Sequence, residues 1–333
     1  MDLSTLWFLL IAVLFIGYFV LEGFDFGVGI LLPVLAHDER ERRVLINTIG
    51  PVWDGNEVWV ITAGGAMFAA FPEWYATLFS GFYLPLLLIL VALILRGVAF
   101  EYRGKRPDPA WRARWDTAIV AGSLLPALLW GVAFANIVRG VPLDADHEYI
   151  GNLWHLLNPY ALLGGLVTLT LFTTHGAVFL ALKTTGDIRT RANALAARTG
   201  LITGALAVAF LTWTILDIRG GTTATILAIL AAAALVAGLA ANRAGREGRA
   251  FLGTAAAIAL AVATLFAALF PNVLPSTTDT ANNLTIDNAS STPYTLKIMT
   301  WVALAFTPIV LLYQSWTYWV FRRRIGVRDI PDA

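Results

Sequence analysis

The sequence predicts an all-α membrane protein with nine transmembrane helices, and its composition and hydrophobic pattern support this prediction. Hydrophobic residues make up 58% of the 333 residues, charged residues only 14%, and the mean hydropathy is +0.71. A soluble globular domain is far less apolar than this. Nine apolar stretches are each near or above the roughly 20 residues that a helix needs to cross a bilayer. They run over 6–35, 52–70, 74–101, 116–138, 158–182, 199–217, 222–241, 250–270 and 294–321.

The second stretch is the least regular of the nine. It begins with the polar run 53–57, and only the turn at 72–73 separates it from the third stretch. The two long outer segments, 139–157 and 271–293, are rich in polar residues. We predict both to be loops that join helices, without a folded domain of their own.

Basic residues gather on one side of the membrane in this arrangement. Nineteen of the 23 Lys and Arg residues follow the first, third, fifth, seventh and ninth stretches, whereas three lie on the other side and Arg96 lies within the third stretch. Loops rich in Lys and Arg stay in the cytoplasm. We therefore expect the N-terminus outside and the C-terminus in the cytoplasm, because a missing or additional crossing would break the alternation.

A weak internal similarity predicts how the helices group. The first and fifth stretches run in the same direction, and each has a polar residue followed by glycine at similar depth, Glu22-Gly23 and His175-Gly176. A shift of four helices preserves direction, which favours two four-helix bundles plus one peripheral helix. The expected units are 1–139, which carries the acidic motifs, 140–270, and 271–333 with the outer loop, the ninth helix and a basic tail.

Charge and cysteine content exclude several classes of function. The net charge is only +1, so binding to nucleic acid has no electrostatic basis. The chain has no cysteine, which excludes disulfides, thiolate zinc sites, iron–sulfur clusters and covalent attachment of c-type haem.

Two carboxylates lie inside the first apolar stretch. Glu22 and Asp25 are three residues apart, and an ionised carboxylate within a membrane costs a few kcal/mol unless it is paired or hydrated. Gly23 and Gly27 form a face of small residues on which another helix can approach closely. Asp25 is therefore either a structural hydrogen-bonding group or part of a water-lined proton path, and we favour the path.

A second acidic pair opens the second stretch. Asp54 and Glu57 are also three residues apart and share one helix face. Asp54 could have only a structural role, because a carboxylate stabilises the N-terminal end of a helix by capping it and by interacting with the helix dipole. Because the first stretch ends and the second begins on the same side, however, Asp25 and Asp54 could line one route inward from the cytoplasm, which Glu57 would extend.

Other polar residues near these acids are expected to be structural. Arg96, Glu101 and Arg103 close the third stretch, and Arg96 can extend to the interface or pair with a carboxylate. Trp53 and Asn56 are expected to pack between helices. The interface and structural residues are then Glu22, Gly23, Gly27, Trp53, Asn56, Arg96, Glu101 and Arg103.

The histidines argue against haem in this chain. Of four histidines, only His175 lies inside an apolar stretch. A bis-histidine haem needs two axial ligands on facing helices at matched depth. Met67 and Met299 could serve as axial partners by type, but methionine in a membrane helix is usually a packing residue. No cluster has the spacing of metal ligands.

Several motifs along the chain resemble those of subunit II of cytochrome bd-type quinol oxidases. The match covers nearly the whole chain in the right order. It is carried by Glu22-Gly23-Phe24-Asp25-Phe26-Gly27-Val28-Gly29, Arg42-Arg43-Val44-Leu45-Ile46-Asn47, Trp53-Asp54-Gly55-Asn56-Glu57-Val58-Trp59, Leu157-Asn158-Pro159-Tyr160 and Phe270-Pro271-Asn272-Val273-Leu274-Pro275-Ser276.

The resemblance implies a heterodimeric oxidase in a bacterial plasma membrane that passes electrons from quinol to oxygen. Two b-type haems and one d-type haem would lie in the partner, subunit I, and this chain would bind none alone. The aspartate of the WDGN motif, here Asp54, would feed cytoplasmic protons toward the partner, with Asp25 as a second element. The resemblance also allows a structural quinone in this chain, bound membrane lipids and a small accessory subunit.

The sequence departs from the family pattern at two places, and two other functions stay open. Glu57 stands where some relatives have glutamine, and only about five residues join the sixth and seventh stretches, where some relatives carry a long insert. One alternative is a secondary transporter that couples an ion through Asp25 and Asp54. The other is a purely structural scaffold subunit, whose acids only cap and pack.

Overall fold

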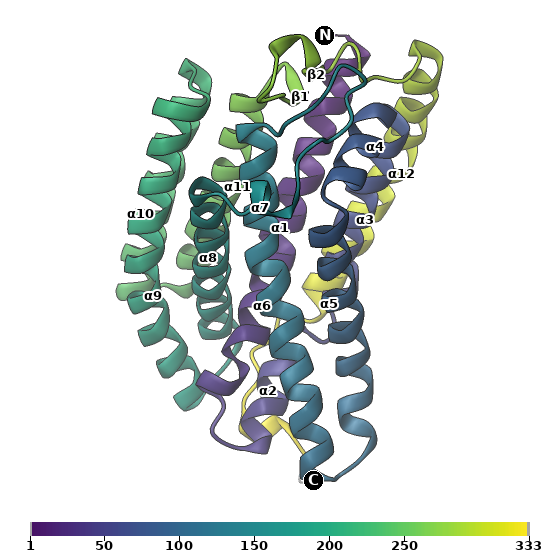
Figure 1. Ribbon diagram of the computed structural model, residues 1–333. Helices are drawn as coiled ribbons and strands as arrows, with labels where there is room; N and C mark the ends of the chain where they lie inside the picture. The colour runs from purple at the N-terminus through teal and green to yellow at the C-terminus, as the bar shows by residue number, and fades with distance from the viewer. Residues whose placement is uncertain (1, 332–333) are drawn as a thin grey trace.

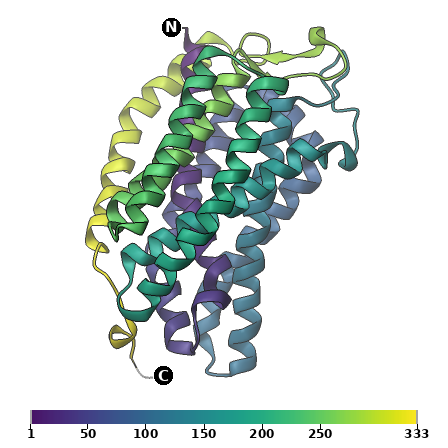
Figure 2. The same ribbon diagram turned by 90° about the vertical axis from the view of Figure 1, so that its left-hand side faces the viewer.

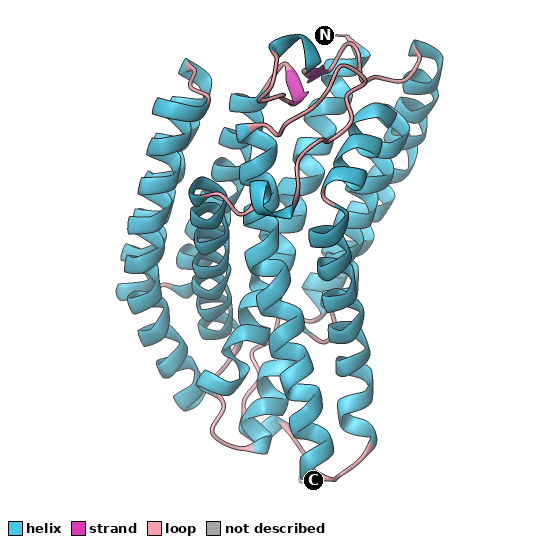
Figure 3. Ribbon diagram, in the orientation of Figure 1, coloured by secondary structure: helices cyan, strands magenta, loops and turns pink. Residues whose placement is uncertain are grey.

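The computed structural model describes residues 2–331 and consists almost entirely of helices that run along one common direction (Figures 1 and 3). Within that range, eight helices are long and apolar enough to cross a membrane. They are α1 (Leu3–Leu35), α5 (Tyr83–Tyr102), α6 (Pro109–Arg139), α8 (Pro159–Lys183), α9 (Gly186–Trp213, continued by a π-helical turn Thr214–Ile218), α10 (Thr222–Arg243), α11 (Glu247–Leu269) and α12 (Pro293–Val320).

The second predicted crossing differs from these eight. It forms helix α3 (Trp53–Ala70), which has 18 residues and is followed directly by α4 (Pro72–Gly81). The polar run 53–57 fills the first turns of α3 and lowers its hydropathy, so α3 is not among the eight apolar helices. Nine crossings therefore remain a prediction. The described chain starts and ends at opposite ends of the bundle (Figure 2).

Helix ends follow from local sequence. Asp2 accepts a hydrogen bond from the backbone N–H of Thr5 and caps α1. Asn158 caps α8 and is followed by Pro159, whose missing N–H suits the first position of a helix. Some of the loops that join the long helices are short. Only residues 219–221 connect the π-helical turn to α10.

Helix α1 lies at the centre of the arrangement. It packs against α3, α6, α8 and α11, while α8 pairs with α9 and α10 pairs with α11. The approach of α1 to α8 depends on glycine, because a Cβ built on Gly27 would lie 2.1 Å from the carbonyl oxygen of Phe172 and 2.7 Å from the Cα of Gly176. Helix α12 packs chiefly on α1 and α3 and exposes most of its surface.

Short elements lie between the predicted crossings, some of them in the two outer segments predicted to be loops. Helix α2 (Glu39–Ile49) follows the first crossing, capped by Asp38, and buries Val44, Leu45 and Ile49. A short helix α7 (Leu153–Leu156) and an antiparallel pair of strands, β1 (Asn272–Leu274) and β2 (Leu284–Thr285), lie in the outer segments. The strands form because Val273, Leu274 and Leu284 can be buried against the helix ends, a tertiary effect that local composition does not reveal.

Candidate functional site

A buried group of charged side chains joins α1, α3 and α5. The guanidinium of Arg96 in α5 contacts the Glu22 carboxylate in α1, and its Nη2 lies 3.6 Å from Oε2 of Glu57 in α3. The Arg96 and Glu22 side chains are fully buried. The Arg96 guanidinium also lies over the Phe26 ring, 4.7 Å from its centroid. The pair therefore sits among apolar groups within the bundle.

A second network holds the other acid of α1. Asn56 in α3 donates from Nδ2 to Oδ2 of the fully buried Asp25 at 2.7 Å. The hydroxyl of Tyr318 in α12 donates to Oδ1 of the same amide at 2.6 Å. Gln314, one turn before Tyr318, accepts a hydrogen bond from the indole N–H of Trp59 at 2.9 Å. Asn56, which the sequence suggested was only a packing residue, thus bridges Asp25 to the peripheral helix.

The charges in this region do not balance. Glu22, Asp25 and Glu57 supply three carboxylates and Arg96 one guanidinium. Four buried atoms, Oε2 of Glu22, Oδ1 of Asp25, and Nε and Nη1 of Arg96, have no hydrogen-bond partner in the described chain. Buried polar atoms of this kind are costly unless a proton, water or another group satisfies them. A proton on one of the three carboxylates would reduce both the excess negative charge and this cost.

Asp54 lies apart from Asp25. It is exposed in the first turn of α3 and makes no hydrogen bond or ion pair with any described residue. Glu57, one turn further along α3, is the acid that faces Arg96. The structure therefore brings Glu57, Arg96 and Glu22 together and leaves Asp54 on the outer face, with no direct contact to Asp25. Of the remaining predicted residues, Trp53 packs on Phe100 and Glu101 is exposed.

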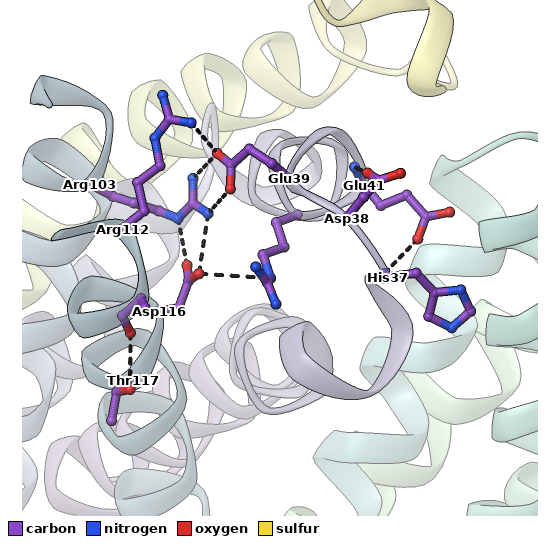
Figure 4. Close-up of polar contacts among 10 residues, drawn as sticks. His37, Asp38, Glu39, Glu41, Arg103, Arg112, Asp116 and Thr117 are labelled. Atoms are coloured by element: carbon purple, nitrogen blue, oxygen red, sulfur yellow. Dashed lines mark hydrogen bonds and ion pairs between the residues drawn. The ribbon is translucent and has the colours of Figure 1, made fainter. Parts of the chain in front are cut away.

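A third polar group ties α2 to the ends of α5 and α6 (Figure 4). Arg103 donates to both Glu39 oxygens at 2.9 and 2.8 Å, and its Nε lies 2.5 Å from Oδ1 of Asp116. Arg112 lies 3.4 Å from Glu39, and Arg42 lies 3.8 Å from Asp116. Burial by itself would raise the pKa of Glu39, but hydrogen bonds and charge from Arg103, with Arg112 and Arg42, lower it.

Sequence reasoning missed several of these partners. Glu39, Asp116 and Tyr318 were not singled out, although Asp116 directly follows a segment with five basic residues, and an acid beside such a segment is a signal for an ion pair. Tyr318 carried no such signal. Its role depends on where α12 crosses α3, which local sequence does not specify.

The surroundings of His175 do not fit an axial haem ligand. Its Nδ1 lies 2.7 Å from Oγ1 of Thr254, and its Nε2 lies 3.2 Å from the carbonyl oxygen of Val20. The ring also stacks on Phe251, with centroids 4.8 Å apart. Both nitrogens are engaged, so neither is free to bind iron. Among the described residues, no group of three or more His, Cys, Asp or Glu side chains is placed to hold a metal ion.

An apolar cavity of about 120 Å³ lies between α6, α8, α9, α10 and α11. Its one polar lining side chain is Thr168, whose hydroxyl already donates to the carbonyl oxygen of Ala127 at 2.6 Å. The rest of the lining is apolar. It offers no free donor for the carbonyl oxygens of a quinone ring.

Comparisons with known proteins agree along the whole chain. Residues 3–321 match the family model for cytochrome bd terminal oxidase subunit II. The chain is 44% identical to cytochrome bd ubiquinol oxidase subunit 2 of Bacillus subtilis, with 98% of each protein covered. It is 38% identical to cytochrome bd-I ubiquinol oxidase subunit 2 of Escherichia coli K12, over 98% of this chain and 96% of that one.

The fold also has a solved counterpart. A chain of the bd oxidase from Geobacillus thermodenitrificans superposes with a TM-score of 0.79, covering 96% of this chain and 99% of that chain at 18% sequence identity. At that identity the likeness concerns the fold alone.

Proposed function

Because this chain belongs to the family of cytochrome bd terminal oxidase subunit II, a component of a quinol oxidase in the bacterial plasma membrane, we propose that it is a haem-free subunit that delivers cytoplasmic protons to a haem-bearing partner. Reduction of oxygen to water consumes protons. Carboxylates placed in this chain would supply them, while the haems of the partner would carry the electrons from quinol to oxygen.

We include α3 as a membrane crossing in addition to the eight apolar helices, which gives nine crossings in all. Eight crossings would return the chain to the side on which it began, whereas residues 2 and 331 lie at opposite ends of the bundle. A polar start is tolerated in a crossing helix when its acids face other helices instead of lipid. The contact of Glu57 with Arg96 meets this condition.

The position of Asp54 is the observation that carries the proton-supply proposal. On α3, Asp54 shares one exposed helix face with Val58, Ile61 and Phe68. Three of these four residues are large and apolar, and exposed apolar surface of this kind marks a protein or lipid contact. We infer that this face meets the partner subunit, which places Asp54 at the cytoplasmic end of that contact.

Two groups of side chains lie further into the bundle than Asp54, and neither is bonded to it. Glu57 lies one helical turn away and links to Arg96 and Glu22, while Asn56 links to Asp25. Asp54 would accept a proton from the cytoplasm, and Glu57 and Asp25 would tune or extend the route. Contact of the partner with this face of α3 would also stabilise the partner.

Replacing Asp54 in the assembled complex tests the proposal. Asp54→Asn keeps size and hydrogen bonding but removes the titrating group, so oxygen reduction should slow at least tenfold while the haem spectra stay unchanged. Glu73→Gln is the matched control, because Glu73 is an exposed acid at the start of α4, after the same crossing, and its turnover should stay normal. Normal turnover in an assembled Asp54→Asn complex would exclude the proposed role.

The same experiment addresses the scaffold alternative. A scaffold whose acids only cap and pack predicts that Asp54→Asn lowers the yield of assembled complex without changing the turnover of what assembles. No observation in the structure favours the secondary transporter.

A further inference from the structure

We propose that a pocket at the cytoplasmic end of the bundle binds the phosphate headgroup of an anionic phospholipid. The pocket has a volume of about 320 Å³ and lies between α2, the end of α5 and the start of α6. Polar side chains supply much of its lining. The lining residues are Glu39, Arg43, Ile46, Asn47, Phe100, Arg103, Gly104 and Arg112.

The charges in the pocket leave an excess of positive charge for a ligand. Three guanidinium groups and one carboxylate line it. Arg103 is occupied by Glu39 and Asp116. Arg43, by contrast, donates to a neutral acceptor, the carbonyl oxygen of Pro331, at 2.9 Å. A phosphate could therefore pair with Arg43 without breaking an ion pair.

Arg112 is the second group available to a phosphate. It lies 3.4 Å from Glu39, which is itself bound in bidentate fashion by Arg103. The Nε of Arg112 is buried and has no hydrogen-bond partner in the described chain. Two guanidinium groups on neighbouring helices suit the recognition of a phosphate, since the planar fork of arginine matches two of its oxygens.

Aromatic side chains place the pocket at the level of lipid headgroups. Trp111 and Trp115 at the start of α6 pack edge to face with centroids 5.6 Å apart, and Tyr102 at the end of α5 lies 5.9 Å from Trp115. Tyr and Trp gather at the boundary between membrane and water. Basic pockets at this boundary on the cytoplasmic side suit anionic lipids.

A neighbouring groove favours a lipid over a free phosphate. A hollow of about 300 Å³ is lined by Leu32, Pro33 and Val120 together with Arg42 and Asp116. Asp116 is also bonded to Arg103 of the pocket, so the two hollows share one ion network (Figure 4). The groove offers an apolar surface for an acyl chain beside the site for the headgroup.

The test uses the purified oxidase complex, with this chain and its partner, stripped of loosely bound lipid in mild detergent. Native mass spectrometry would then measure binding of phosphatidylglycerol and of phosphatidylcholine. We expect one saturable phosphatidylglycerol site, and the double variant Arg43→Gln, Arg112→Gln should weaken it at least tenfold. The control Arg328→Gln removes a cytoplasmic charge that does not line the pocket, on a side chain that is 84% exposed, and should bind as the unmodified complex does.

A second pair of variants separates lost charge from lost folding. Arg43→Lys with Arg112→Lys keeps both charges, so it should retain binding within about threefold, and unchanged haem spectra would show that each complex is assembled. Equal binding by the double Gln variant would overturn the proposal, as would equal loss in Arg328→Gln or equal affinity for phosphatidylcholine. Complete displacement of the lipid by millimolar inorganic phosphate would show that the pocket takes free phosphate instead.

Discussion

The guanidinium of Arg96 in α5 contacts the carboxylate of Glu22 in α1, and neither side chain reaches solvent. Removing two charges from water is costly, and their attraction offsets that cost only when the remaining polar atoms are also satisfied. Here three guanidinium and carboxylate atoms of the pair are unpartnered in the described chain. A pair of this kind makes the fold depend on both members.

Loss of the guanidinium should destabilise the subunit strongly. Arg96→Met leaves Glu22 buried without its partner, and breaking one side of a buried ion pair costs about 3–5 kcal/mol. We expect little assembled complex, measured as haem-containing protein per membrane. Adding Glu22→Gln removes the uncompensated charge and should restore part of that yield. Equal yields for the single and the double variant would contradict this account.

Removing the Tyr318 hydroxyl should change the environment of Asp25 without disturbing the fold. Tyr318→Phe deletes the 2.6 Å hydrogen bond to Asn56, which is worth about 1 kcal/mol. The Asn56 amide, which donates to Asp25, is then less firmly held. If Asp25 belongs to the proton route, turnover should fall severalfold and its pH profile should shift, with unchanged haem spectra. Tyr313→Phe, on the same helix but exposed, is the control and should change neither.

Enlarging Gly27 should separate α1 from α8. Gly27→Ala places a methyl group 2.1 Å from the Phe172 carbonyl oxygen, and backbone on both helices must shift to admit it. We expect a lower midpoint of thermal inactivation for the complex. Gly248→Ala is the control, because no atom outside its own stretch of helix lies within 4 Å of the added Cβ and alanine favours the helix there. A shift as large in Gly248→Ala would mean that close approach is not the cause.

Acid should loosen the docking of α2 through Glu39. Its folded-state pKa is lowered, so the stability it contributes is fully present above the ordinary value of 4.5 and is lost as the pH falls from there through the folded-state pKa. Hydrogen exchange of the α2 amides should therefore accelerate as the pH falls below about 4.5, beyond the intrinsic pH dependence of exchange. Glu39→Gln should exchange faster at neutral pH and show little further change on acidification. An identical pH response in both proteins would exclude Glu39 as the group responsible.

Much of the overall design can be predicted from sequence because it depends on composition along the chain. Eight of the nine predicted crossings are helices apolar enough to span a membrane, and the resemblance to subunit II of cytochrome bd oxidases is confirmed. The remaining predicted crossing, α3, shows where composition alone does not identify a membrane helix. Its acids lower the hydropathy of the segment, and only their partners on other helices explain how they are accommodated.

The sequence by itself determined which segments are apolar, which side carries the basic residues, and that four carboxylates lie within the first two of these segments, because these are properties of single residues and their neighbours along the chain. Only the tertiary structure decided their partners. Glu22 and Glu57 meet Arg96, Asp25 meets Asn56 and through it Tyr318, and Asp54 stays on an outer face. These contacts join residues 31 to 262 positions apart. Such pairs are set by how helices cross and rotate against one another, which no local pattern encodes.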